Sequence, residues 1–298
     1  MSSTLEAGGE VHVTPGPIPG EAPVSVPVLA PVWRTGDNCG MKRRILVTGA
    51  TGGIGLLLCD RLADDYDLVM QGRTPRTPEQ EKELRKVDLT DLEGLQKVME
   101  GVDTVVHMAG AASPESTWEE VLEANIIGLR NVFEASRLAG VRRVVYASSN
   151  HAMGGYDRDG EWPVYPHFLP RGDSLYGMSK AMGEQMGRFY HDQYDLDVIC
   201  LRIGWMTDDP AEADAELLHA MWLSEDDCEQ VVRRAIEAET TWGLYYAISD
   251  NPNRRWDMTN TMLELGYRPK DSWADEPEAD DKVVEGGEPA PANWPKDS

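Results

Sequence analysis

Residues 44–55 read RILVTGATGGIG, a short apolar run that leads directly into a glycine-rich turn. The run predicts a buried strand, and the residues after the turn begin a helical pattern. Gly49 permits the tight turn, Gly52 lets the backbone approach a pyrophosphate, and Gly55 lets the helix pack closely on the strand. The helix N-terminus then offers free N–H groups to an anion. The segment predicts a dinucleotide site, and a flexible turn without a ligand is the alternative.

The rest of the chain alternates between strand-like and helix-like patterns. Apolar residues at helical spacing are clearest over 118–139, a segment that Gly140 closes. Strands separated by helices indicate parallel pairing with right-handed crossovers. We therefore predict the α/β class, with a Rossmann-type doubly wound parallel sheet and a small C-terminal substrate-binding portion. The strands are expected at 44–48, 67–71, 104–107, 143–147, 197–202 and 244–248, and the helices at 53–63, 92–99, 118–139, 176–194, 226–237 and 258–265.

Composition divides the chain into three parts. Residues 1–40 contain six prolines and no periodicity, which predicts a disordered N-terminal extension. That extension is either native or the product of an upstream start codon, since Met41 reads as a natural start. Residues 41–272 are expected to form the Rossmann dinucleotide-binding domain with its small substrate lobe. Residues 273–298 are expected to form an acidic, disordered tail.

The charge balance excludes several classes of partner. Asp and Glu number 52 against 28 Lys and Arg, a formal net charge of −24. Such acidity opposes binding to nucleic acid or to an anionic membrane. Because the acids run through the whole chain, they favour a halophilic surface adapted to a cytoplasm of high ionic strength. The four scattered cysteines show no metal-ligand spacing. No apolar run approaches the ~20 residues of a membrane span, and no secretory signal is visible, so we expect a cytoplasmic protein.

A tyrosine and a lysine carry the predicted chemistry. Residues 176–180 read YGMSK and open a predicted helix, which places Tyr176 and Lys180 on one helical face. A phenol has a pKa of about 10, but a neighbouring ammonium favours the phenolate and makes Tyr176 a usable general base. Ser149 follows a predicted strand and can donate to an oxygen that becomes negative. We predict Ser149, Tyr176 and Lys180 as the catalytic residues of an enzyme.

The glycine spacing GxxGxxG, the segments 87–89 (VDL) and 107–110 (HMAG), and Asn125 accompany this pair. Together they resemble the short-chain dehydrogenase/reductase superfamily, in particular its extended branch, the NAD-dependent epimerase/dehydratase family. The resemblance covers nearly all of residues 43–268. It implies an oxidoreductase that uses NAD or NADP, and a possible homodimer formed by the two long helices. By this resemblance the cofactor contacts are Gly49, Thr51, Gly52, Gly53, Ile54, Gly55, Arg73, Asp88, Leu89, Ala109, Gly110, Asn125, Tyr176, Lys180 and Ile203.

The choice between the two cofactors depends on the end of the second strand. An NAD enzyme would place an acidic residue there to bond the ribose hydroxyls, whereas this chain has Gln71, Gly72 and Arg73. Arg73, supported by Arg76, could pair with a 2′-phosphate, which favours NADP. The alternative is that Arg73 stacks on adenine and NAD is used.

A closer resemblance concerns the substrate. Residues 148–151 (SSNH), 201–204 (LRIG) and 221–227 (MWLSEDD) resemble the uronate dehydrogenases and the NAD-dependent glucose-6-phosphate dehydrogenases of halophilic archaea. Those enzymes oxidise an aldose at its anomeric carbon to a lactone. By that similarity Asn150 and His151 bind sugar hydroxyls, although His151 could instead bond the loop backbone. The expected substrate contacts are Ser113, Ser149, Asn150 and His151.

The chain also departs from the uronate pattern. Where a uronate enzyme carries an Arg for the substrate carboxylate, residues 216–219 read ELLH. Arg171 or Arg158 could still reach in from a loop. A neutral aldose or another small alcohol or aldehyde is therefore the expected substrate. Two alternatives remain: an epimerase or dehydratase of nucleotide sugars, which the short stretch after Ile203 disfavours, and a non-catalytic dinucleotide sensor, which would not need a base.

Overall fold

The computed structural model describes residues 42–212 and 215–275 of the chain. The expected extension over residues 1–40 and the tail from residue 276 onward lie outside these residues. The described part includes Trp273, whose ring stacks on His219 at 4.4 Å between centroids. The packed chain therefore reaches beyond the expected boundary at residue 272.

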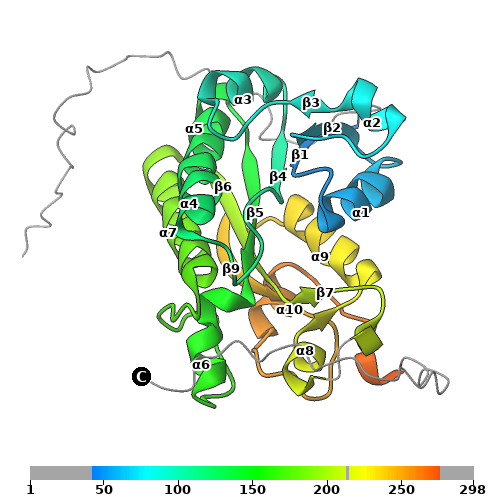
Figure 1. Cartoon of the computed structure of the whole chain (residues 1–298), viewed down its shortest axis with the longest axis vertical. Helices are drawn as coiled ribbons and strands as arrows, with labels where there is room; N and C mark the ends of the chain where they lie inside the picture. The colour runs from blue at the N-terminus through cyan, green and yellow to red at the C-terminus, as the bar shows by residue number, and fades with distance from the viewer. Residues whose placement is uncertain (1–41, 213–214, 276–298) are drawn as a thin grey trace, which may run out of the picture. The chain divides into compact units, whose positions relative to one another are not determined.

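Strands make up a single large sheet and one small pair in the described chain. The strands are β1 (Arg44–Thr48), β2 (Asp67–Gly72), β3 (Arg85–Lys86), β4 (Thr104–His107), β5 (Arg143–Ser149), β6 (Asp197–Ile203), β7 (Trp205–Met206), β8 (Trp222–Leu223) and β9 (Trp242–Ala247). Seven of them form a parallel sheet in the order β3-β2-β1-β4-β5-β6-β9 (Figure 1). From β1 the strand order runs outward to β2 and β3 on one side, and from β4 it runs outward to β5, β6 and β9 on the other. This reversal of strand order between β1 and β4 confirms the doubly wound Rossmann-type fold.

Helices cover both faces of this sheet. They are α1 (Gly53–Leu62), α2 (Pro78–Glu83), α3 (Leu92–Val98), α4 (Trp118–Glu120), the π-helix η1 (Val121–Gly128), α5 (Leu129–Ala139), the 3₁₀ turn η2 (Asn150–Met153), α6 (Gly154–Arg158), α7 (Leu175–Tyr194), the 3₁₀ turn η3 (Pro210–Glu212), α8 (Glu216–Ala220), α9 (Glu225–Glu237), α10 (Thr259–Glu264) and the 3₁₀ turn η4 (Trp273–Asp275). α3, α5 and α7 lie on one face, and α1 and α9 on the other (Figure 1).

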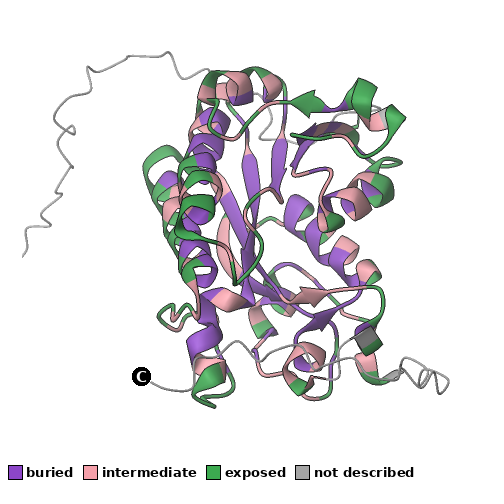
Figure 2. Cartoon of the chain, in the orientation of Figure 1, coloured by how far each residue is buried: buried purple, intermediate pink, exposed green. Residues whose placement is uncertain are grey.

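The core has two layers because successive side chains of a strand point to opposite faces. In β1, Ile45 and Val47 pack with α1 and α9, whereas Leu46 packs with α3 and α5. All three are fully buried. Figure 2 shows the central strands buried, with the exposed residues on the outer sides of the helices. This rigid sheet fixes where the loops at its carboxyl edge can lie.

The longest predicted helix is not uniformly α-helical. The chain begins this helix as α4, continues over Val121–Gly128 as the π-helix η1, and returns to α-helix in α5. The predicted helix over 118–139 is therefore confirmed, and its middle eight residues have π-helical rather than α-helical hydrogen bonds. π-helical segments are rare and often occur at functional sites. A Cβ on Gly128 would lie 2.8 Å from Leu89 Cβ, so glycine is what allows this close contact.

The sequence patterns missed the shortest elements, namely α2, β3, η2, α6, β7, η3, α8, β8 and η4, none of which exceeds six residues. Too few residues are present in each for a periodic pattern to form. Among the helices that the structure describes, none is long and apolar enough to span a bilayer. The same residues contain no His, Cys, Asp and Glu cluster that could hold a metal ion.

Candidate active site

The predicted functional residues gather at the carboxyl edge of the sheet. The glycine turn follows β1, Gly110 follows β4, Ser149 ends β5, and Ile203 ends β6. Ser149 and Ile203 pair directly across β5 and β6. In open α/β sheets, ligands bind in this crevice where the strand order reverses. The fold therefore places the dinucleotide motif and the catalytic motif at one edge.

The glycine turn has the shape that a pyrophosphate needs. Gly49 has φ +66°, and a Cβ there would lie 2.7 Å from Ala109 N. A Cβ on Gly55 would overlap the carbonyl of Gly49, whereas a Cβ on Gly53 would meet nothing within 4 Å. The helix α1 begins at Gly53, and no side chain caps its N-terminus. The first N–H groups of α1 are therefore available to an anion, as the backbone of a dinucleotide site requires.

These contacts give a direct test of the turn. Gly49→Ala is expected to lower the melting temperature and to weaken NAD binding, because the new methyl group meets the Ala109 backbone at a positive φ. Gly53→Ala is the matched control, and its melting temperature is expected to stay unchanged or rise slightly, since alanine favours a helix. Thermal denaturation and a fluorescence titration with NAD measure both effects. Equal melting temperatures for the two variants would contradict this interpretation of the turn.

The end of β2 organises the adenosine side of the site. Gln71 is buried, its Oε1 accepts from Gly49 N at 3.3 Å, and its Nε2 donates to the Val87 carbonyl. Arg73 and Asp88 are exposed nearby. Hydrogen bonds from Thr90 to the Asp88 carboxylate lower the pKa of that carboxyl, and the charge of Arg73 adds to the effect. Gln71 therefore braces the glycine turn, a role that no local sequence pattern indicates because its two partners lie in other segments.

Asn125 connects the π-helix to the loop after β4. Its Oδ1 accepts from Ala111 N at 2.8 Å, and its Nδ2 donates to the Ala111 carbonyl and to Ser179 Oγ. A Cβ on Gly110 would lie 2.7 Å from Asn125 Oδ1 and 3.8 Å from Lys180 Nζ. Asn125 therefore joins the Gly110 loop to the helix α7, which carries Tyr176 and Lys180.

The structure brings Ser149, Tyr176 and Lys180 together. Ser149 ends β5, and the other two lie one turn apart at the start of α7. All three are at most 8% exposed. The Ser149 Oγ accepts from His151 N at 3.2 Å and lies close enough to Tyr176 to lower the pKa of its phenol. Lys180 Nζ lies 5.6 Å from the centroid of the Tyr176 ring and donates to the Ala147 carbonyl at 2.7 Å.

Burial dominates the electrostatics of this cluster. It raises the pKa of the Tyr176 phenol. The nearby Ser149 hydroxyl opposes this effect, and the charge of Asp173 reinforces it. Burial also lowers the pKa of Lys180 to about 8, while Glu184 acts in the opposite direction. Perturbed pKa values of buried groups in one cleft are typical of functional sites.

The predicted substrate residues differ in their surroundings. Asn150 is 3% exposed, and neither its Oδ1 nor its Nδ2 has a hydrogen-bond partner among the described residues. His151 Nδ1 bonds Asp173 Oδ2 at 2.7 Å, and its ring meets the Tyr176 ring edge-on at 5.6 Å between centroids. Ser113 lies in an exposed loop, where its hydroxyl accepts from Glu115 N.

Asp173 is a site residue that the sequence analysis missed. It lies on the loop before α7, outside any recognised motif, so only the fold brings it to His151. The arginines that were considered as anion clamps are paired instead. Arg171 contacts Asp159 and Glu161, and Arg158 contacts Asp159. His219, which lies in the segment where a uronate enzyme carries its arginine, hydrogen-bonds the Pro210 carbonyl through Nε2.

Comparison with known proteins identifies the family of the chain. The NAD dependent epimerase/dehydratase family matches residues 45–206. The NAD-dependent glucose-6-phosphate dehydrogenase of Haloferax volcanii is 37% identical over 79% of this chain and 96% of its own length. The L-arabinose 1-dehydrogenase (NAD(P)(+)) of the same organism is 39% identical over 78% of this chain and 98% of its own length. A mutant uronate dehydrogenase from Agrobacterium tumefaciens, complexed with NAD, is 30% identical with a TM-score of 0.70, covering 81% of this chain and 92% of that one.

The predicted family and fold thus agree with relatives that are matched over nearly their whole length. The chain belongs to the NAD dependent epimerase/dehydratase family of enzymes.

Proposed function

We propose that this protein is an NAD(P)-dependent oxidoreductase that oxidises an aldose at C1 to a lactone. The observation that carries the proposal is the cluster of Ser149, Tyr176 and Lys180 beside the glycine turn at one edge of the sheet. A base next to a dinucleotide site is what proton and hydride removal from one alcohol require. The aldose dehydrogenase relatives support the choice of reaction.

The residues have complementary roles in this proposal. The Tyr176 phenolate takes the proton from the C1 hydroxyl, and Ser149 donates a hydrogen bond to the same oxygen as its charge develops. The Lys180 ammonium favours the phenolate through its charge and is held in place by the Ala147 carbonyl. The bound nicotinamide supplies the acceptor for the hydride that leaves C1. Loss of one proton and one hydride converts the cyclic aldose to its lactone.

The proposed cofactor-binding residues suit a nicotinamide dinucleotide, and Arg73 favours NADP over NAD. The N-terminus of α1 and Gly52 would hold the pyrophosphate, and Asn125 and Gly110 shape the wall beside Lys180. Arg73 is exposed directly after β2. In this fold the residue at the end of the second strand is the one that contacts the adenosine ribose. The guanidinium of Arg73 can pair with a 2′-phosphate, and Asp88 lies close enough for their charges to interact.

A neutral aldose is the proposed substrate. Arg158 and Arg171 are engaged by Asp159 and Glu161, and Arg255 bonds Asp157 at 2.7 Å. A substrate carboxylate or phosphate would have to displace these carboxylates. The unpartnered amide of Asn150 suits a hydroxyl, which can both donate to it and accept from it.

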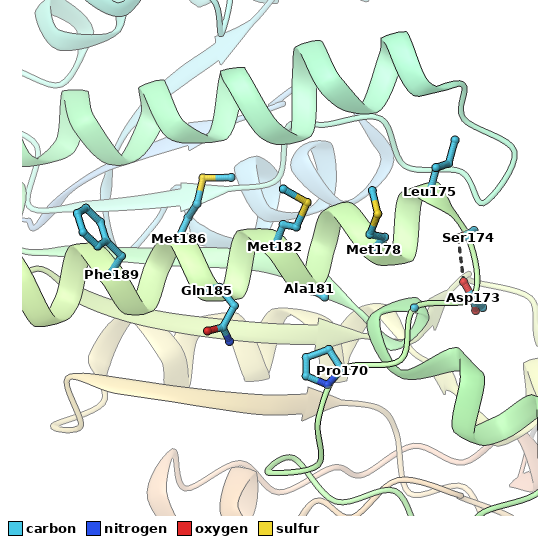
Figure 3. Close-up of a pocket in the computed structure, with 11 residues that line it drawn as sticks. Pro170, Asp173, Ser174, Leu175, Met178, Ala181, Met182, Gln185, Met186 and Phe189 are labelled. Carbon is cyan, nitrogen blue, oxygen red and sulfur yellow. Dashed lines mark hydrogen bonds between the residues drawn. The ribbon is translucent and has the colours of Figure 1, made fainter.

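We also propose that the protein works in a cytoplasm of high salt as a homodimer. The net charge of −24 and the Haloferax relatives support the first part. For the second, a groove of about 830 Å³ runs along α7, and Figure 3 shows a row of apolar side chains there. These exposed residues include Leu175, Met178, Met182 and Phe189. A second copy would bury them, and the molar mass in solution tests this.

The function is tested by absorbance of the reduced nicotinamide. NAD and NADP are offered separately, with a panel of neutral aldoses, sugar phosphates and uronic acids, at high and at low salt. The expected result is reduction with neutral aldoses in high salt, with a preference for NADP. Reduction of NAD or NADP only with a sugar phosphate or a uronate would contradict the proposal of a neutral substrate. Tight cofactor binding with no reduction by any sugar would favour the epimerase or the sensor instead.

A further inference from the structure

Asp173 is held in one orientation at the edge of the site. Its Oδ2 bonds His151 Nδ1 at 2.7 Å, and its Oδ1 accepts from Ser174 Oγ at 2.8 Å. Its own N–H donates to the His151 carbonyl at 3.3 Å. The side chain is only 6% exposed, and a Cβ on Gly154 or Gly177 would strike the carboxylate. The surrounding backbone therefore leaves Asp173 little freedom to turn away from His151.

This contact determines which nitrogen of His151 can accept a hydrogen bond. A carboxylate only accepts, so Nδ1 must carry the hydrogen, and in the neutral imidazole Nε2 is then the acceptor. Within the described chain, Nε2 has no hydrogen-bond partner. The side chain of His151 is 30% exposed, and its ring lies edge-on to Tyr176. An acceptor nitrogen is thus available beside the residue proposed as the base.

We propose that Asp173 is a positioning residue that fixes His151 with Nδ1–H toward its carboxylate, so that Nε2 accepts a hydrogen bond from the sugar hydroxyl next to C1. The proposal rests on the proposed function, because it takes C1 to react at Tyr176. The imidazole is the ring adjacent to Tyr176, so the hydroxyl that it reaches is the one on the neighbouring carbon.

The carboxylate of Asp173 also acts on Tyr176 through its charge. The groups around the phenol are Ser149 and Tyr146 from β5, His151 from η2, Lys180 from α7 and Asp173 itself. Asp173 contributes to raising the pKa of Tyr176. Asp173→Asn keeps the size of the side chain and removes the charge. This variant should therefore bind the sugar more weakly and yet reach full ionisation of Tyr176 at lower pH.

The experiment compares an aldose that the enzyme oxidises with its 2-deoxy analogue. In the wild type, the analogue is expected to show a KM raised by about tenfold, because the site loses the hydroxyl that it is built to bond. Asp173→Asn and His151→Ala are each expected to raise the KM of the parent sugar by about tenfold. In both variants the KM values of the parent sugar and of the 2-deoxy analogue should therefore become similar. The kcat profile of Asp173→Asn should shift to lower pH, because the charge that helps to raise the pKa of Tyr176 is gone. Glu161→Gln, which removes an exposed carboxylate nearby, serves as the control and should match the wild type.

A second readout needs no substrate. Long-range ¹H–¹⁵N spectra of the imidazoles, assigned with His151→Ala, report which nitrogen of His151 is protonated. An Nδ1–H form in the wild type supports the proposal, and an Nε2–H form overturns it whether or not aldoses are oxidised. An equal rise in KM for the parent sugar and for the 2-deoxy analogue in Asp173→Asn, without a shift of the kcat–pH profile, would also overturn the proposal. Failure of the wild type to oxidise any aldose overturns the proposed function, and the spectra then decide on Asp173 separately.

Discussion

Replacing Tyr176 by phenylalanine is expected to lower kcat for aldose oxidation by about 10²- to 10⁴-fold, with little change in NAD or NADP affinity. The substitution removes the only proposed proton acceptor and leaves the packing of the ring in place. Because burial raises the pKa of the phenol, wild-type activity should rise as the pH increases through the alkaline range. Burial lowers the pKa of Lys180 to about 8, so loss of the ammonium charge should limit that rise.

Tyr146 offers the matched control for this prediction. Its ring is as close to Lys180 Nζ as that of Tyr176, at 5.2 Å against 5.6 Å. Its hydroxyl is buried and has no hydrogen-bond partner among the described residues. Tyr146→Phe should therefore leave kcat within about twofold and should not destabilise the fold, since removing an unpartnered buried hydroxyl is neutral or favourable. Steady-state kinetics and a cofactor titration of both variants decide the matter. Comparable losses of kcat would refute the role of Tyr176.

Replacing Glu184 by glutamine is expected to destabilise the fold by about 3–5 kcal/mol, because it leaves a buried guanidinium without its counter-charge. Glu184 on α7 and Arg202 on β6 are both 0% exposed and form a two-pronged pair, with both contacts at 2.8 Å. Ser148 Oγ donates to Glu184 Oε1 at 2.6 Å. This network ties the end of β5, next to Ser149, to the helix that carries Tyr176. Its loss should therefore lower both the melting temperature and kcat.

Asp192→Asn is the control, because it makes the same carboxylate-to-amide change on the same helix. Asp192 pairs with Arg188 at 2.8 Å, but both side chains are at least 40% exposed. An exposed pair of this kind contributes little, so the variant should melt within about 2 °C of the wild type, against a fall of roughly 10 °C for Glu184→Gln. Thermal denaturation in high salt measures both. Similar melting temperatures for the two variants would show that the buried pair does not hold β6 to α7.

Much of the fold was predictable because its signals are local. The strand β1 and the glycine turn follow from one short stretch, and the parallel sheet follows from alternating patterns. The π-helix was not predictable, since apolar side chains at similar spacing suit an α-helix as well as a π-helix. What distinguishes it is a pair of distant contacts: Gly128 against Leu89 and Asn125 against Ala111.

The sequence by itself determined the family. It also predicted the dinucleotide turn and proposed Ser149, Tyr176 and Lys180 as catalytic residues, because each lies in a motif of fixed local spacing. Only the tertiary structure decided which side chains surround them. Asp173 meets His151 across 22 positions of the chain, and Glu184 meets Arg202 through the packing of a helix on a strand. The pairing of Arg158 and Arg171 with nearby carboxylates likewise depends on how their loop folds. Contacts between segments that are distant in sequence, and the burial that shifts the pKa values of Tyr176 and Lys180, exist only once the sheet and its helices are assembled.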